Sequence, residues 1–240
     1  IGGGAFSGCT DLQKVVIPST VTNLGSNAFN GCTSLTDAEF NYNTQKGYTL
    51  EIGGGAFYGC SALENVMLSE NVSRIGSETF YGCGALETLI LPESVTYLGS
   101  MMIRGTAVNS ITIPKSVSDC GVNNSGSNYY LGPLAGASYL TAVTIEDGME
   151  KIPDYLCSSQ SLSSYITSVN IPSSVTSIGN RAFCGCDKLV NAEMPDTVTS
   201  IGENVYSQST KLKSIKLSST LKTIGGGAFS GCTDLQKVVI

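Results

Sequence analysis

The 240-residue chain contains no histidine and no tryptophan, and only 13 of its residues are lysine or arginine. Histidine is the commonest general base in enzymes, so its absence removes the usual centre of acid–base catalysis. The sequence has no serine nucleophile-elbow motif, and its Gly-Gly-Gly runs lack the Lys-Ser/Thr pair of a phosphate-binding loop. We therefore expect that the chain is not an enzyme and binds no cofactor.

Basic residues are also too scattered for a nucleic-acid interface, which requires clustered lysine and arginine. The formal net charge is −6, which favours a neutral or basic partner over a polyanion. No apolar stretch approaches the roughly 18 residues of a membrane-spanning helix, so we expect no membrane insertion. Nine cysteines are present, but without histidine or a Cys-x-x-Cys pair they predict no metal site.

One residue pattern recurs along the whole chain. Residues 1–17 and 224–240 are identical, and residues 52–68, 75–91 and 178–194 follow the same pattern, apolar-Gly-x-x-Ala-Phe-x-Gly-Cys-x-x-Leu-x-x-apolar-x-apolar, without a gap. Most units are 23 residues long. Aligned on the cysteine, the units place one residue each in a single column: Cys9, Cys32, Cys60, Cys83, Thr106, Ala137, Ser159, Cys186, Ser209 and Cys232.

A repeat of this length with Leu-x-x-apolar-x-apolar in each unit is typical of a leucine-rich repeat solenoid. One unit cannot bury its own apolar side chains, whereas stacked units share a continuous core. Val15 and Ile17 alternate with Lys14 and Val16, which predicts a strand with one face inward. Strands related by translation along a stack run parallel, so we expect one parallel sheet and a single array over residues 1–240.

Residues 171–189 (IPSSVTSIGNRAFCGCDKL) carry the fullest form of the repeat, Ile-Pro-x-x-Val-x-x-Ile-Gly-x-x-Ala-Phe-x-x-Cys-x-x-Leu. This pattern resembles the BspA-like, Treponema pallidum-type class of leucine-rich repeats. The resemblance implies a right-handed solenoid of about ten repeats, mostly β with short 3₁₀ or helical turns and a parallel sheet on the concave face. It also implies a secreted or cell-surface protein, since several members act in adhesion to host proteins or other cells.

Three segments, residues 41–49, 122–131 and 163–165, interrupt the repeat. The two longer ones combine tyrosine with asparagine, glycine and serine, a composition that antibody paratopes use for binding. We predict that both lie on one side of the array, roughly 15 Å apart. The candidate partner-binding residues are Tyr42, Tyr48, Asn123, Asn124, Tyr129 and Tyr130. The alternative is that these segments are tolerated surface loops without a partner.

Two columns of the repeat predict the core. Phe29, Phe57, Phe80, Phe183 and Phe229 should be buried in one line, and the cysteines should form a parallel line of buried thiols. The outward strand positions are small and mixed, which favours a solvated face over a specific one. They are Lys14/Val16, Asp37/Glu39, Asn65/Met67, Thr88/Ile90, Ser110/Thr112, Ala142/Thr144, Ser168/Asn170, Asn191/Glu193 and Ser214/Lys216.

These features indicate a non-catalytic interaction module of a secreted or cell-surface, adhesin-like protein. Its partner would be a protein or glycan of the host or a neighbouring cell. The alternative is a structural spacer or stalk that presents another domain. The chain begins and ends within units, so we expect it to be a piece of a longer array and to show weak head-to-tail association between copies.

Overall fold

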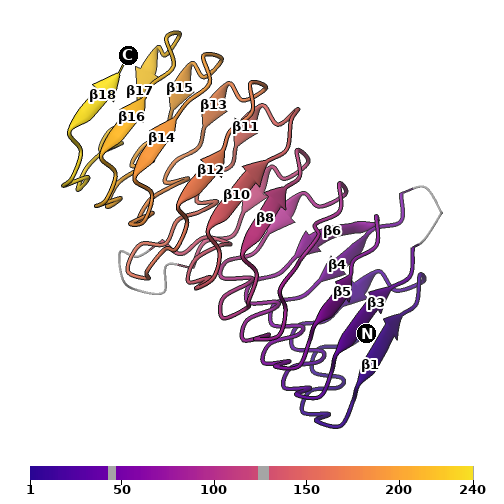
Figure 1. Ribbon diagram of the computed structural model, residues 1–240. Coiled ribbons are helices and arrows are strands. Elements are labelled where there is room, and N and C mark those ends of the chain that lie inside the picture. Colours follow the sequence, from indigo (N-terminus) through magenta and orange to yellow (C-terminus); the bar gives the residue numbers. More distant parts are fainter. Residues whose placement is uncertain (43–46, 124–129, 240) are drawn as a thin grey trace.

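The structure is a computed structural model that describes residues 1–42, 47–123 and 130–239. Within these ranges the chain forms a parallel β-solenoid of about nine turns and contains no helix, so none that could cross a membrane (Figure 1). Each turn of the solenoid consists of a longer strand, a shorter strand and a run of tight turns. The predicted solenoid is confirmed, but its turns are hydrogen-bonded bends rather than helices.

The longer strands stack into the sheet that the apolar alternation predicts. Val15 pairs with Ala38, and Ala38 pairs with Val66, in parallel register. These strands are β1 Lys14–Ile17, β3 Asp37–Phe40, β5 Asn65–Met67, β8 Ser110–Ile113, β10 Ala142–Ile145, β12 Ser168–Asn170, β14 Asn191–Glu193, β16 Ser214–Lys216 and β18 Lys237–Val239. We call the solvent-facing side of these strands, together with residues 88–91 between β5 and β8, the long-strand face.

A second parallel sheet, which the sequence did not predict, is built from the apolar residue that precedes each Gly-x-x-Ala-Phe segment. Its short strands are β2 Asn23–Leu24, β4 Leu50–Ile52, β6 Val72–Ile75, β7 Tyr97–Leu98, β9 Asp119–Cys120, β11 Lys151–Ile152, β13 Ser177–Ile178, β15 Ser200–Ile201 and β17 Thr223–Ile224. Strands of two residues have almost no alternation to detect, so the pattern appeared as a turn.

Interruptions in the two sheets are staggered along the array. Among the described residues the longer strands pair as β1-β3-β5, β8-β10-β12 and β14-β16-β18, with residues 88–91 in no strand. The short strands pair as β2-β4-β6-β7-β9 and β11-β13-β15-β17. Where the long-strand sheet parts, the short strands remain paired, and where the short strands part between β9 and β11, β8 and β10 remain paired.

Glycine is required at two columns of the repeat for two different reasons. Gly31 has φ of 72°, a left-handed conformation that costs L-residues about 1–2 kcal/mol. Gly25 has an ordinary φ, but a Cβ at this position would collide with the backbone nitrogen of Gly3 in the neighbouring turn. The first column therefore serves the turn, and the second lets adjacent turns approach closely.

Aromatic rings form the centre of the core. Phe57 is fully buried, and its ring stacks between those of Phe29 and Phe80 at centroid distances of 5.4 Å and 5.7 Å. The predicted ring column is confirmed, but it consists of two runs, and two residues join it that the prediction omitted. The runs are Phe6, Phe29, Phe57, Phe80 and Phe183, Tyr206, Phe229. Phe6 and Phe229, at the outer ends, are only partly buried.

The cysteines are free thiols, as predicted, and most are buried beside the rings. One column assignment is wrong. Ser159 N donates to Cys184 O as Gly8 N donates to Asn30 O, so Ser159 occupies the glycine position. Gln160, the next residue, therefore occupies the cysteine position of the repeat.

The prediction that the two long insertions share a side is also wrong. Residues 41–49 connect the long strand β3 to the short strand β4, whereas residues 122–131 follow the short strand β9 and lead into the tight turns. The prediction failed because the short strand, which it did not include, lies between the two points of the repeat at which the insertions occur. The insertions thus leave the array at different corners.

Candidate functional site

The long-strand face is a regular surface whose side chains are free of the core. Its register follows from the strand pairing, which aligns Val16 with Glu39 and Glu39 with Met67. Inward positions of the same strands, such as Ile17 and Ala38, are buried. The outward residues therefore lie in regular columns, and nothing in the core determines their identity.

Near its N-terminal end this face carries charged side chains that form ion pairs and hydrogen bonds between strands. Lys14 Nζ lies 3.4 Å from Glu39 Oε2. The Asp37 carboxylate accepts hydrogen bonds from Thr36 Oγ1 at 2.6 Å and Asn65 Nδ2 at 3.0 Å, and these bonds lower the pKa of Asp37. Exposed charges of this kind orient a partner but contribute little stability.

The middle of the face is apolar. Met67 is 60% exposed and Ile90 is 81% exposed, and both occupy the column that contains Val16 at 43%. A shallow hollow of about 380 Å³ extends from Ile90 past Ser110 to Thr144, where residues 88–91 leave the sheet ladder. Exposed large apolar side chains gathered in this way mark interaction surfaces more often than solvated ones.

Toward the C-terminal end the face becomes polar again. Lys216 Nζ lies 2.7 Å from Glu193 Oε1, and this hydrogen bond raises the pKa of Lys216. Ser214 Oγ donates to Asn191 Oδ1 at 2.6 Å. A hollow of about 390 Å³ lies among these side chains, at the split between β12 and β14. The face therefore offers a partner an apolar centre between two polar ends.

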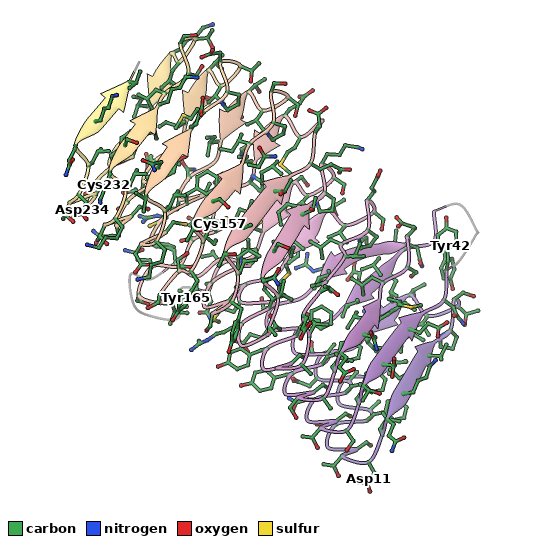
Figure 2. The ribbon with its side chains drawn as sticks, viewed as in Figure 1. Asp11, Tyr42, Cys157, Tyr165, Cys232 and Asp234 are labelled. Carbon is green, nitrogen blue, oxygen red and sulfur yellow. The ribbon has the colours of Figure 1, made fainter. Side chains whose placement is uncertain are left out.

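The predicted tyrosine anchors of the first insertion differ in their surroundings. Tyr42 is 56% exposed and lies near the N-terminal end of the array (Figure 2). The hydroxyl of Tyr48 donates to the carbonyl oxygen of Thr20 at 2.9 Å, so this side chain fastens the insertion to the preceding turn. Only Tyr42 is therefore directed away from the array.

The second insertion is also fastened where it is described. Asn123 and Leu131 exchange backbone hydrogen bonds of 3.0 Å and 3.1 Å. The Tyr130 ring stacks on Tyr155, and the Arg181 guanidinium lies 4.2 Å from its centroid. Asn124 and Tyr129 lie outside the described residues. A binding role for these residues stays a prediction.

Arginine–aromatic stacks are a surface feature that the sequence reasoning missed. The Arg74 guanidinium lies 3.4 Å from the centroid of the Tyr97 ring, and that of Arg104 lies 5.2 Å from the Tyr81 ring. Each pair is 23 residues apart, one full unit, so the signal was present in the alignment of columns. Such contacts contribute about 0.5–1 kcal/mol at exposed sites.

The thiols and carboxylates of the described ranges do not gather into a metal site. No group of three cysteine, aspartate or glutamate side chains there could hold a metal ion. Burial raises the pKa of the Cys60 and Cys186 thiols to about 12, which makes them poor nucleophiles.

Comparison with known proteins places the repeat in a described class. The family described as BspA type Leucine rich repeat region matches the chain in six copies, over residues 1–128 and 150–240. No curated protein matches the chain significantly.

Three similar solved structures come from bacterial proteins. A leucine-rich repeat protein from Bacteroides ovatus ATCC 8483 is 25% identical over 99% of this chain and 81% of that chain, with a TM-score of 0.47. A leucine rich cell surface protein from Faecalibacterium prausnitzii A2-165 is 23% identical over 100% and 82%, with a TM-score of 0.41. The pneumococcal vaccine antigen PcpA is 19% identical over 95% and 56%, with a TM-score of 0.49.

Proposed function

The chain belongs to the BspA type leucine-rich repeat family, and from this premise we propose that it is a non-catalytic binding module of a secreted or cell-surface protein. Its partner is a protein or glycan of the host or a neighbouring cell, as in adhesion. The relatives described as a cell surface protein and as a vaccine antigen support this location.

The observation that carries the proposal is the exposed apolar column on the long-strand face. Met67 and Ile90, in successive turns, contribute nothing to the core, and exposing them to water has a cost that a partner would remove, whereas Val16 lies beyond Glu39 at the charged end. The charged pairs Lys14–Glu39 and Glu193–Lys216 lie toward either end of the column. An apolar centre with a polar rim is the usual anatomy of a protein-binding surface.

The test replaces Met67 and Ile90 by threonine, the residue found in the next turn at the same outward position of the long-strand face. Met67→Thr with Ile90→Thr copies Thr112 and removes apolar contact area without adding charge. Each buried side chain of this size contributes about 1.5–3 kcal/mol, so we expect binding to weaken at least tenfold. Ile224→Thr is the matched control, since Ile224 is 51% exposed on the short strand β17.

The measurement is adhesion of the labelled protein to intact cells and to purified matrix proteins. Loss of adhesion in the double variant, with adhesion retained in Ile224→Thr, supports the proposal. Equal adhesion of all three proteins places the contact elsewhere. If the unaltered chain adheres to no target, the result favours the alternative, a spacer that presents another domain. The pairing of strands between successive turns also suits a spacer.

A further inference from the structure

A second hollow lies away from the long-strand face, beside the short insertion at residues 163–165. It has a volume of about 450 Å³ and is lined mainly by polar side chains from three successive turns, including Ser159, Gln160, Ser163, Asp187 and Gln208. Small-molecule sites usually measure about 300–1,000 Å³, so the hollow can hold a small ligand. Without the insertion, the repeat would not supply Ser163.

Two residues that line this hollow each carry a buried polar side-chain atom without a partner. Ser159 Oγ and Gln160 Oε1 are inaccessible to solvent and make no hydrogen bond, and they are the two such side-chain atoms among the described residues. An unsatisfied buried polar group costs about 1–3 kcal/mol. Native proteins leave such groups where a water, an ion or a ligand completes them.

One residue of the hollow has a backbone conformation that the repeat does not demand. Eight described residues other than glycine have positive φ, and six of them occupy the position of Gly4 in their units, where the turn demands it. Gln208, at 63°, occupies the position of Gly31, where the turn also demands it, so Ser161, at 73°, is the one of the eight outside a repeated position, and it lines the hollow. Strained residues outside a repeated structural position are characteristic of functional sites.

The Asp187 carboxylate in the hollow is held in place by a hydrogen bond and lies beside a lysine of opposite charge. Asp187 Oδ1 accepts a hydrogen bond from Ser164 N at 3.0 Å, and Lys188 Nζ lies 3.7 Å from Asp187 Oδ2. The carboxylate therefore keeps one orientation and presents acceptor capacity to a hydroxyl donor. With Lys188 beside it, the pair carries no net charge, which suits a neutral ligand.

An exposed tyrosine follows in sequence the residues that line the hollow. Tyr165 is 40% exposed and follows Ser163 by two residues, and Figure 2 shows it far from Tyr42. Tyr139 is 64% exposed in the preceding turn. Ala142 pairs with Ser168, so these two tyrosines, each three residues earlier, occupy the same column. An aromatic face with a polar tip provides apolar contact area beside hydrogen-bonding groups.

We infer that this hollow is a binding site for a neutral saccharide. Sugar hydroxyls would bond to Asp187 and, after rotation of the side chains, to Ser159 Oγ and Gln160 Oε1. A sugar ring would pack against Tyr165. The inference deepens the proposed function and rests on it in treating the chain as a binding module.

The test is saturation-transfer difference NMR of the 240-residue chain with the methyl glycosides of glucose, mannose, galactose and N-acetylglucosamine. Gln160→Met keeps the side-chain length and removes the amide, and Tyr165→Ala removes the ring. Each should weaken binding roughly tenfold. Ile224→Thr, at an exposed residue of β17 that does not line the hollow, should leave binding unchanged, and thermal unfolding of each variant checks that it is folded.

Saccharide signals that weaken in Gln160→Met and Tyr165→Ala but persist in Ile224→Thr support the site. Absence of signal with all four glycosides, or equal signals from all variants, overturns it. In that case water fills the hollow. The adhesion assay separates this result from the proposed function, because Gln160→Met leaves the long-strand face intact. A chain that adheres to matrix proteins but binds no glycoside refutes the saccharide site alone.

Discussion

Cys60 Sγ donates a hydrogen bond to the carbonyl oxygen of Phe29 at 3.0 Å, so the thiol column is tied to the ring column of the preceding turn. The same bond links Cys83 to Phe57, Cys232 to Tyr206 and, with a hydroxyl in place of the thiol, Ser209 to Phe183. Serine can therefore replace cysteine in this column because either side chain is a short donor.

Burial of these thiols predicts a loss of stability at alkaline pH. The pKa of Cys60 and that of Cys186 are raised to about 12 by desolvation, whereas an unfolded thiol has a pKa of about 8.5. Between these values the unfolded chain releases protons that the folded chain retains. Below about pH 8.5 the stability is fully present, and above it each such thiol lowers the free energy of unfolding by about 1.4 kcal/mol per pH unit.

Urea unfolding between pH 8 and 10 measures this slope, and Cys60→Ser isolates one thiol. Serine does not ionise in this range, so the variant should lose stability less steeply by about 1.4 kcal/mol per pH unit. Identical slopes for both proteins would show that the Cys60 thiol ionises equally in the folded and unfolded chains.

Phe57→Ala should destabilise the array by about 3–5 kcal/mol, because it leaves a cavity between two stacked rings. Phe6→Ala is the control. Its ring is 43% exposed and stacks on Phe29 alone among the described rings, so its removal should cost less than half as much. Urea unfolding followed by circular dichroism gives both values, and similar losses would contradict the central position of Phe57.

Glycine substitutions separate close approach from open space. Gly76→Ala puts a methyl group against the backbone nitrogen of Gly54, which cannot move without disturbing the sheet, so we expect a loss of about 1–3 kcal/mol. Gly84→Ala meets no atom within 4 Å and has an ordinary φ, so it should be neutral or stabilising by up to about 1 kcal/mol. Thermal unfolding of the two variants tests the difference, and tolerance of Gly76→Ala would mean that the turns can separate.

The insertions remain a test of the predicted binding residues. Replacing residues 41–49 by a four-residue turn copied from residues 172–175 removes Tyr42, the exposed candidate, together with the bond from Tyr48 to Thr20. We expect the array to stay folded and binding to cells or matrix proteins to fall. Tyr42→Ala alone should give much of the same effect. Full binding by the shortened protein would show that this insertion is only a surface loop.

The sequence predicted those parts of the fold that repeat with enough length to be recognised. The alternation around Val15 predicted the long strands, and the Phe and Cys columns predicted the core, because each recurs at fixed spacing. Tyr206 could have been added to the rings, since it aligns with Phe183. The short strands were missed because two residues such as Leu24 and its neighbour carry no periodicity.

The polar hollow could not have been predicted from the sequence. Gln160 and Gln208 lie in different turns, and their approach to one wall depends on how the insertion at residues 163–165 displaces the chain. The one sign of the hollow in the sequence is that Gln160 replaces the cysteine or serine that later units have at this position, Cys186 and Ser209. A departure from a repeat shows where to look, but it does not show which departures meet in space.

The staggered interruptions of the two sheets have a mechanical consequence. At each interruption of one sheet, the hydrogen-bonded strands of the other sheet still join the two turns, so the junction can act as a hinge about the paired strands. The paired side changes from the short strands at β6–β7 to the long strands at β8–β10, so the two hinges open in opposite directions. Under a bending load the array can therefore flex both ways while every pair of adjacent turns keeps a hydrogen-bonded edge. Compliance of this kind would let a rod of identical units absorb shear at a surface without unfolding any one of them.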